Sequence, residues 1–196
     1  MKNILITGAS RSIGKSIALR FAQENCRLFI NCNRSAEDLY VVKSEVEQIF
    51  ISNRNYTSSC VPLIGDIGNP EDVRQMFQTI HEKCNGIDIL INNAGIAHIG
   101  LLCDMTDDEW NRILQTNLSS VFYCSRAAIP HMVSQKSGKI LNISSIWGSV
   151  GASCEAAYSA TKSGVNGLTK ALAKELAPSN IQVNAIACGA IDTVMN

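Results

Sequence analysis

The sequence KNILITGASRSIG, from Lys2 to Gly14, predicts a strand, a tight turn and the start of a helix. Gly8 permits the sharp turn after the apolar strand, and Gly14 permits close packing of the helix. Free backbone N–H groups at the start of such a helix bind a pyrophosphate. The stretch therefore indicates a dinucleotide-binding fold, although a purely structural turn before a helix has the same glycine pattern.

On either side of this stretch, short apolar runs alternate with longer amphipathic segments along the chain. This alternation predicts one α/β domain over 1–196, a doubly wound Rossmann-type parallel sheet with the strand order 3-2-1-4-5-6. A capping box at Thr106 and Glu109, and proline after Asn69, mark two helix starts. We expect strands at 2–6, 27–31, 60–64, 87–92, 138–143 and 181–187, and helices near 12–24, 35–51, 70–84, 107–134 and 156–177.

Charge and composition favour a small substrate. Lys and Arg together number 17 and Asp and Glu 17, so no net field attracts nucleic acid or an anionic membrane. The eight cysteines are scattered without a C-x-x-C pair, and we expect no metal site. No apolar run approaches the roughly 20 residues of a membrane span, and the amino end does not have the pattern of a signal peptide. We therefore expect a cytoplasmic protein.

The second predicted strand ends in Asn31-Cys32-Asn33-Arg34-Ser35, without an acid that would bind an adenosine 2′-hydroxyl. Arg11 and Arg34 are suited to a 2′-phosphate instead, because a guanidinium forms paired hydrogen bonds with phosphate oxygens. We therefore expect NADP(H) as the cofactor. The alternative is that both arginines are ordinary solvated surface residues.

A group of residues suited to proton transfer follows in the second half. Tyr158 and Lys162 stand four residues apart on a predicted helix, hence on one face. Ser145 follows a predicted strand, and Asn117 lies within a predicted helix, where asparagine is mildly unfavourable. Reduction of a carbonyl needs a hydride on carbon and a proton on oxygen. The Y-x-x-x-K pair with a preceding serine resembles the short-chain dehydrogenase/reductases. The resemblance implies that Tyr158 donates the proton, its pKa being lowered by Lys162 and the oxidised nicotinamide, and that Ser145 hydrogen-bonds the carbonyl oxygen.

These motifs resemble the short-chain dehydrogenase/reductases, over the chain from Lys2 to Asn196. The family's T-G-x-x-x-G-x-G turn is matched except that Ser12 replaces its middle glycine, and N-N-A-G at 92–95 and Y-x-x-x-K at 158–162 follow in the family's order. The resemblance implies catalytic roles for Asn117, Ser145, Tyr158 and Lys162, with Asn117 holding a water and Lys162 the nicotinamide ribose. It implies a cofactor site made of Gly8, Ser10, Arg11, Ser12, Ile13, Gly14, Asn33, Arg34, Asp66, Ile67, Asn93, Ala94, Gly95, Tyr158, Lys162, Cys188, Gly189 and Ile191.

Within the family, the chain is broadly similar to 3-oxoacyl-[acyl-carrier-protein] reductases. Its stretch from Ser144 to Glu155 also resembles the elongation factor P 5-aminopentanone reductases, which reduce a ketone on a modified lysine. Trp147 and Glu155, with Ser145, are candidates for the substrate mouth and suit an amine, but a core tryptophan and a solvated glutamate are equally plausible. His98 is a weaker candidate. A sugar-alcohol or hydroxysteroid dehydrogenase would differ only in its substrate.

Two departures from the family concern the carboxyl end. Cys188-Gly189 stands where the resemblance implies Pro-Gly, and the chain stops at Asn196, where relatives continue into a seventh strand. A fragment that binds NADP(H) without turnover is therefore an alternative to an active enzyme. The family's dimers and tetramers imply a homo-oligomer, with helices 107–134 and 156–177 at one contact and Ala156, Gly164, Leu168 and Leu172 as an apolar stripe.

Overall fold

A computed structural model describes residues 1–193 and contains a parallel sheet of six strands in the order β3-β2-β1-β4-β5-β6. This confirms the predicted fold class and strand order. The strand order reverses between β1 and β4, and ligands of such sheets bind at this point, beyond the carboxyl ends of the strands. The strands are β1 (Lys2–Ile6), β2 (Cys26–Cys32), β3 (Ser59–Ile64), β4 (Ile89–Asn92), β5 (Gly138–Ser145) and β6 (Ile181–Cys188).

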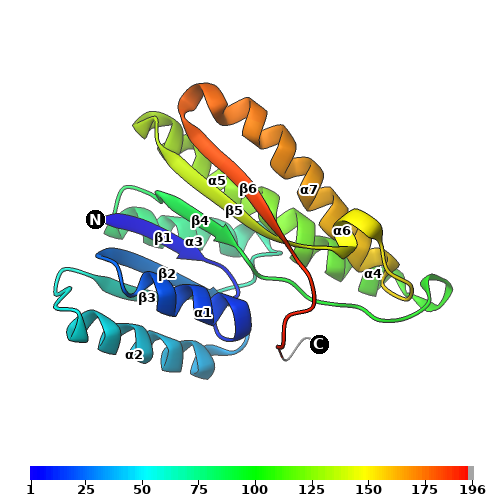
Figure 1. The fold of residues 1–196 in the computed structure, drawn as a ribbon, viewed down its shortest axis with the longest axis horizontal. Coiled ribbons are helices and arrows are strands. Elements are labelled where there is room, and N and C mark those ends of the chain that lie inside the picture. The colour runs from blue at the N-terminus through cyan, green and yellow to red at the C-terminus, as the bar shows by residue number, and fades with distance from the viewer. Residues whose placement is uncertain (194–196) are drawn as a thin grey trace.

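Helices cover the sheet on both faces (Figure 1). One core cluster joins the sheet to α1 (Ser12–Phe21) and α2 (Ala36–Ser52). The other joins it to α3 (Pro70–Lys83), α5 (Ser120–Gln135) and α7 (Ala156–Leu176). Alternation along β1 explains the two layers, since Ile4 and Ile6 belong to the first cluster and Leu5 to the second. Because both faces are covered, the central strands are apolar throughout.

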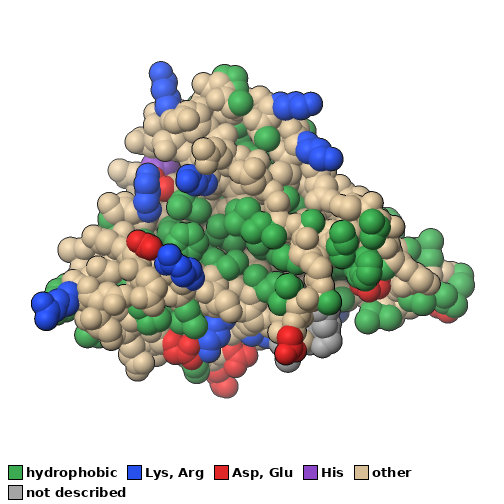
Figure 2. Space-filling model, viewed as in Figure 1, with side chains coloured by type: hydrophobic (Ala, Val, Ile, Leu, Met, Phe, Trp, Pro, Cys, Tyr) green, Lys and Arg blue, Asp and Glu red, His purple; other side chains and the backbone are tan. Residues whose placement is uncertain are grey.

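The face of the sheet that α1 and α2 cover is left without a helix at β5 and β6, within the described residues. Leu141 on β5 is only half-buried and Ile186 on β6 is 49% exposed, although both lie on the face covered elsewhere by α1 and α2. Figure 2 shows apolar side chains gathered over the middle of the molecule in this view. The described residues place no helix of that cluster over these two strands.

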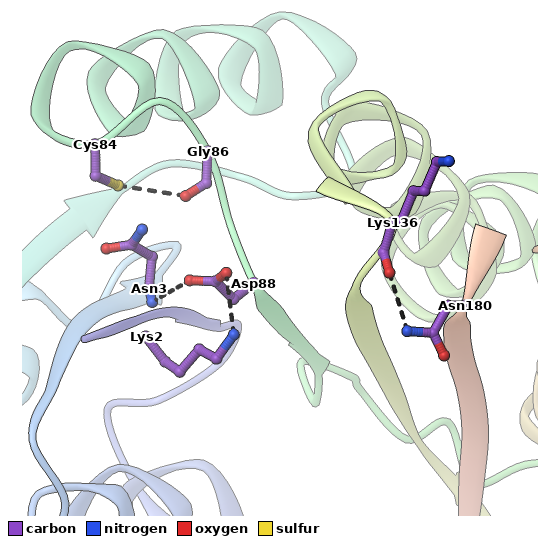
Figure 3. Close-up of polar contacts among 7 residues, drawn as sticks. All are labelled: Lys2, Asn3, Cys84, Gly86, Asp88, Lys136 and Asn180. Carbon is purple, nitrogen blue, oxygen red and sulfur yellow. Dashed lines mark hydrogen bonds and ion pairs between the residues drawn. The ribbon is translucent and has the colours of Figure 1, made fainter. Parts of the chain in front are cut away.

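Polar contacts at the amino ends of the strands hold the sheet opposite the candidate site (Figure 3). The Asp88 carboxylate accepts the backbone N–H of Asn3 at 2.7 Å and lies 3.6 Å from the Lys2 ammonium. The Asn180 amide donates to the carbonyl oxygen of Lys136 at 3.0 Å. These contacts join β1 to the residue before β4, and the end of α5 to the residue before β6.

The predicted helix starts are confirmed. Asn69 accepts the N–H of Glu71 ahead of Pro70, and Thr106 and Glu109 form a capping box at the start of α4 (Asp107–Leu114). The single helix predicted over 107–134 is wrong, because a π-helical segment, η2 (Gln115–Ser119), separates α4 from α5. A short helix, α6 (Trp147–Val150), and the 3-10 turns η1 (Leu102–Asp104) and η3 (Ala177–Ser179) complete the described elements.

Candidate active site

The turn after β1 packs against the segment after β4, and glycine is required at both points of closest approach. A side-chain carbon added at Gly8 would lie 2.7 Å from the Cα of Ala94, and Gly8 has φ of +64°. One added at Gly14 would lie 2.2 Å from the carbonyl oxygen of Gly8. Both glycines are therefore fixed by sterics, as the sequence predicts.

Thr7 holds these two segments together. Its hydroxyl oxygen accepts the N–H groups of Asn93 and Ala94 at 3.0 and 3.1 Å. The Asn93 amide in turn donates to the carbonyl oxygens of Thr7 and Gly8 at 2.9 and 3.0 Å. Thr7 begins the T-G-x-x-x-G-x-G motif, but its role in joining these two segments was not predicted from the sequence.

Ser12 explains why the family's turn has a middle glycine. Its φ is +50°, in the left-handed region, where a Cβ atom is unfavourable. It follows Arg11, which is exposed and extended, and it opens α1. Ser10 and Ile13 are half-buried in the same turn. The departure at Ser12 therefore places strain in the candidate phosphate-binding turn.

The turns after β2 and β3 hold the remaining candidates for the adenosine end. Asn33 and Arg34 are exposed directly after β2. Asp66 is half-buried, and one of its carboxylate oxygens accepts the N–H of Gly68 at 2.8 Å. Ile67 is 4% exposed and packs in the core with α3, so only its backbone faces the turn.

Three of the four predicted catalytic side chains meet at the ends of β5 and α7. The Ser145 side chain lies near enough to the Tyr158 phenol to act on its pKa. The Lys162 ammonium lies 5.6 Å from the centroid of the Tyr158 ring and donates to the carbonyl oxygen of Ile143 at 2.8 Å. Ser145 and Lys162 are buried and Tyr158 is half-buried. The i, i+4 spacing on α7 thus brings the phenol and the ammonium to the serine, as predicted.

Burial is the largest influence on the pKa values of Tyr158 and Lys162. Removal from water raises the pKa of Tyr158 above its ordinary value, although the hydrogen bond from Ser145 opposes this, and the charges of Glu155 and Cys188 raise it further. Burial also lowers the pKa of Lys162 from 10.5 to about 8, while Cys188 opposes that shift. The expected lowering of the Tyr158 pKa is therefore not produced by the protein's own groups.

The fourth residue, Asn117, lies in the π-helical segment and is 1% exposed. Its side-chain oxygen accepts the N–H of Ile96 at 2.8 Å, and its side-chain nitrogen donates to the carbonyl oxygen of Ile96 at 2.8 Å. The same nitrogen donates to the Thr161 hydroxyl at 3.3 Å. The amide is thus committed to protein partners. Asn117 was predicted from the sequence, but its partners Ile96 and Thr161 were not. Contacts between residues far apart in the chain leave no periodic pattern in the sequence.

The candidate substrate residues separate into two groups. Trp147 is 37% exposed, and its backbone N–H donates to the Ser145 oxygen at 3.2 Å. Glu155 acts electrostatically on Tyr158, so both candidates lie beside the Ser145–Tyr158 pair. The charge of His98 instead acts on Glu109 of α4.

The end of β6 reaches the same site. Cys188 is the parallel-strand partner of Ser145, and its carbonyl oxygen accepts the N–H of Ile146 at 2.8 Å. In its thiolate form Cys188 raises the pKa of both Tyr158 and Lys162. Gly189 and Ile191 follow as exposed residues. The residue that stands in place of the family's proline therefore lies next to the catalytic group.

Within residues 1–193, no three His, Cys, Asp or Glu side chains are grouped so that they could hold a metal ion. None of the described helices has both the length and the apolar character needed to cross a membrane.

Comparisons with known proteins agree with this geometry. The sequence profile of the short chain dehydrogenase family matches residues 2–196. The 3-oxoacyl-[acyl-carrier-protein] reductase of Staphylococcus aureus is 40% identical over 97% of this chain and 74% of its own length, and that of Synechocystis is 39% identical with the same coverage. A crystal structure of a dehydrogenase/reductase from Sinorhizobium meliloti superimposes with a TM-score of 0.89 at 33% identity, covering 100% of this chain and 74% of that one. The chain therefore belongs to the short chain dehydrogenase family, the oxidoreductases that act on carbonyl and hydroxyl groups with a nicotinamide cofactor.

Proposed function

We propose that this protein is an NADPH-dependent carbonyl reductase of the 3-oxoacyl-[acyl-carrier-protein] reductase type, acting on a carrier-linked or small-molecule ketone. The observation that carries the proposal is the grouping of Ser145, Tyr158 and Lys162, with the serine acting on the phenol and the Lys162 ammonium 5.6 Å from the centroid of the phenol ring. The reductases of Staphylococcus aureus and Synechocystis support the substrate class. Eight free cysteines within the described residues suit the reducing cytoplasm.

The residues present fit a nicotinamide dinucleotide. Gly8 and Gly14 allow the close packing that shapes the first turn, and the N–H groups at the start of α1 would hold a ligand's phosphates. Asn93, Ala94 and Gly95 would line the next segment, and Lys162 would hold the ribose beside Tyr158. When bound, the cofactor supplies the hydride, and the protein must supply the proton.

Tyr158 is the proton donor in this proposal. With its pKa raised by burial, the phenol is protonated at neutral pH and can donate to the carbonyl oxygen as that oxygen becomes an alkoxide. Lys162, with a pKa of about 8, is mostly charged at pH 7 and stabilises the phenolate that remains.

Ser145 binds the reacting oxygen. Its own oxygen accepts the backbone N–H of Trp147 at 3.2 Å, so its hydroxyl proton is available to donate. A donor held in advance at a developing negative charge stabilises the transition state. Arg11 and Arg34, both exposed at the turns after β1 and β2, would pair with the 2′-phosphate and so favour NADPH.

The test is an NADPH-oxidation assay with three ketones: an acetoacetyl thioester, elongation factor P carrying the aminopentanone modification, and a steroid ketone. We expect the thioester to be reduced fastest. No oxidation with any of the three would support the alternative in which the chain binds NADP(H) without turnover.

One observation favours a second candidate, an elongation factor P 5-aminopentanone reductase. The Glu155 carboxylate lies close enough to Tyr158 to raise its pKa, and Trp147 is 37% exposed beside Ser145. A carboxylate and an aromatic face together attract a substrate ammonium group. In the same assay, faster reduction of the modified elongation factor, and its loss in Glu155→Gln, would select this candidate.

A further inference from the structure

The hydroxyl group of Thr161 lies where three elements of the candidate active site meet. Thr161 is 1% exposed on α7, between Tyr158 and Lys162. Its hydroxyl donates to the carbonyl oxygen of Tyr158 at 2.7 Å and accepts from the Asn117 amide at 3.3 Å. Through Asn117 it is connected to Ile96, directly after the Asn93–Gly95 segment.

The number of available protons fixes the direction of this chain of hydrogen bonds. A threonine hydroxyl has a single proton, and here it goes to the carbonyl oxygen of Tyr158. Thr161 can therefore only accept from Asn117, so the NH2 side of the Asn117 amide must face it. The second amide hydrogen reaches the carbonyl oxygen of Ile96, and the amide oxygen takes the N–H of Ile96. The Asn117 amide is left with one orientation.

This orientation matters because the held segment lies beside the catalytic lysine. A carbon added to Gly95 would lie 3.3 Å from the Asn117 side-chain oxygen and 3.6 Å from the Lys162 ammonium nitrogen. A shift of the segment at 95–96 would therefore move the surroundings of the Lys162 ammonium. Buried hydrogen-bond networks that are fully satisfied hold such positions rigidly.

We propose that Thr161 is a positioning residue that sets the distance between the proton-donating turn of α7 and the Asn93–Gly95 segment, acting through Asn117 and Ile96. The inference rests on the proposed function, since it requires that Tyr158 donates the proton and that this segment holds the cofactor.

The chain contains a matched control for a merely structural role. Thr169, two turns further along α7, has the same chemistry: its hydroxyl donates to the carbonyl oxygen of Val165 at 2.7 Å and accepts from the Asn142 amide at 2.8 Å. It is 7% exposed, and its partner Asn142 lies in β5 and accepts from the Asn92 amide at 2.9 Å. The Thr169 network therefore reaches the residue before Asn93, whereas the Thr161 network reaches Ile96, directly after Gly95 and the surroundings of Lys162. Loss of either hydroxyl should cost similar stability, but only Thr161 should affect the chemistry.

The experiment compares Thr161→Val, Thr161→Ser and Thr169→Val in the full chain. We expect Thr161→Val to lower kcat about tenfold or more, with KM for the ketone changed less than about twofold, because positioning errors act on the chemical step. The Ile96 amide should exchange with deuterium about tenfold faster, since its acceptor is no longer held. Thr161→Ser should restore both kcat and the slow exchange of the Ile96 amide. Thr169→Val should lower Tm by about as much as Thr161→Val does, and should keep kcat within about twofold of wild type.

Unchanged kcat and unchanged Ile96 exchange in Thr161→Val would overturn the proposal, and so would an equal loss of kcat in Thr169→Val. If Thr161→Val does not fold, Thr161→Cys, in which a thiol that is a weaker acceptor replaces the hydroxyl, is judged by the same results, with Thr161→Ser as its control for the lost methyl group. If the wild-type protein reduces no ketone, the proposed function fails, but Ile96 exchange and NADPH affinity still decide whether Thr161 holds the segment.

Discussion

The ammonium nitrogen of Lys162 lies 5.6 Å from the centroid of the Tyr158 ring. In the proposed mechanism the lysine stabilises, from this position, the negative charge that forms on the phenol. The ammonium donates instead to the carbonyl oxygen of Ile143, on the strand that ends in Ser145. The lysine thus connects α7 to β5 at the position where Tyr158 and Ser145 meet.

Tyr158→Phe should remove nearly all turnover and leave NADPH affinity within about twofold of wild type, because the ring stays and only the proton donor is lost. Stopped-flow reduction and calorimetric titration measure the two quantities. Ser145→Ala should retain more activity than Tyr158→Phe, because it removes a stabilising hydrogen bond and leaves the proton donor in place. Substantial residual turnover in Tyr158→Phe would exclude Tyr158 as the acid.

Lys162→Met should raise the free energy of unfolding at pH 7 by up to about 3 kcal/mol while abolishing turnover. Lys162 is 5% exposed, and burial lowers its pKa from 10.5 to about 8. The unfolded chain therefore binds more protons than the folded one between pH 8 and 10.5, and the destabilising effect of the lysine disappears as pH rises through that range.

Urea unfolding of both proteins from pH 7 to 10 tests this. The difference in stability between Lys162→Met and wild type should shrink as pH rises above 8. Cysteine and tyrosine titrations affect both proteins alike and cancel in the difference. A constant difference would mean that the pKa of Lys162 is not shifted.

Arg34→Ala and Arg11→Ala should each weaken NADPH binding about tenfold and leave NADH binding nearly unchanged, because each removes a charged partner of the 2′-phosphate. Calorimetry with both cofactors gives the comparison. Arg20→Ala is the control. Arg20 lies on α1, the helix that follows the first turn, but its guanidinium pairs with Glu24. Equal affinity of the wild-type protein for NADPH and NADH would contradict the proposed preference.

Ser12→Gly should raise the free energy of unfolding by about 0.5–1 kcal/mol, because φ at this position is +50°. The gain is limited by the larger backbone entropy that glycine has in the unfolded chain. Ser12→Ala keeps the Cβ atom and should show no gain, which separates backbone strain from loss of the hydroxyl. Stabilisation by alanine equal to that by glycine would count against strain.

Much of the fold could be predicted from local sequence. The six strands, their order, and the helix starts at Pro70 and Asp107 follow from apolar periodicity and from caps. The π-helical segment around Asn117 could not be predicted, because its altered hydrogen bonding leaves the apolar pattern of a helix nearly unchanged. The sequence pattern therefore predicted one helix where the structure has three segments.

The candidate site could be predicted only in part, because only some of its contacts join residues that are near one another in the sequence. Tyr158 and Lys162 are linked by helical spacing, so their proximity is a local property. The contacts of Thr7 with Asn93, and of Thr161 with Asn117, join residues far apart in sequence. The raised pKa of Tyr158 also depends on burial, which only the packed structure shows. Sequence motifs gave the reacting groups, whereas the groups that hold them required the fold.

The expected contact between subunits can now be assigned to particular side chains. Leu172 of the predicted stripe packs in the core, and Leu118 covers Gly164, so much of the stripe is used within the chain. On α4 and α5, by contrast, Trp110 is 36% exposed and Phe122 44%. We therefore expect α4 and α5 to contribute exposed apolar side chains to the predicted contact.

The protein should be a dimer at micromolar concentration, joined through α4, α5 and α7 around a two-fold axis, because a self-complementary face of this kind forms closed dimers. The Arg126 guanidinium lies 4.7 Å from the centroid of the Phe122 ring and stiffens this face. Phe122→Glu places a charge in the contact and should give a monomer in light scattering. Val41→Glu, at a 56% exposed position on α2 across the sheet, should remain dimeric. A wild-type monomer, or dissociation by both substitutions alike, would exclude this contact.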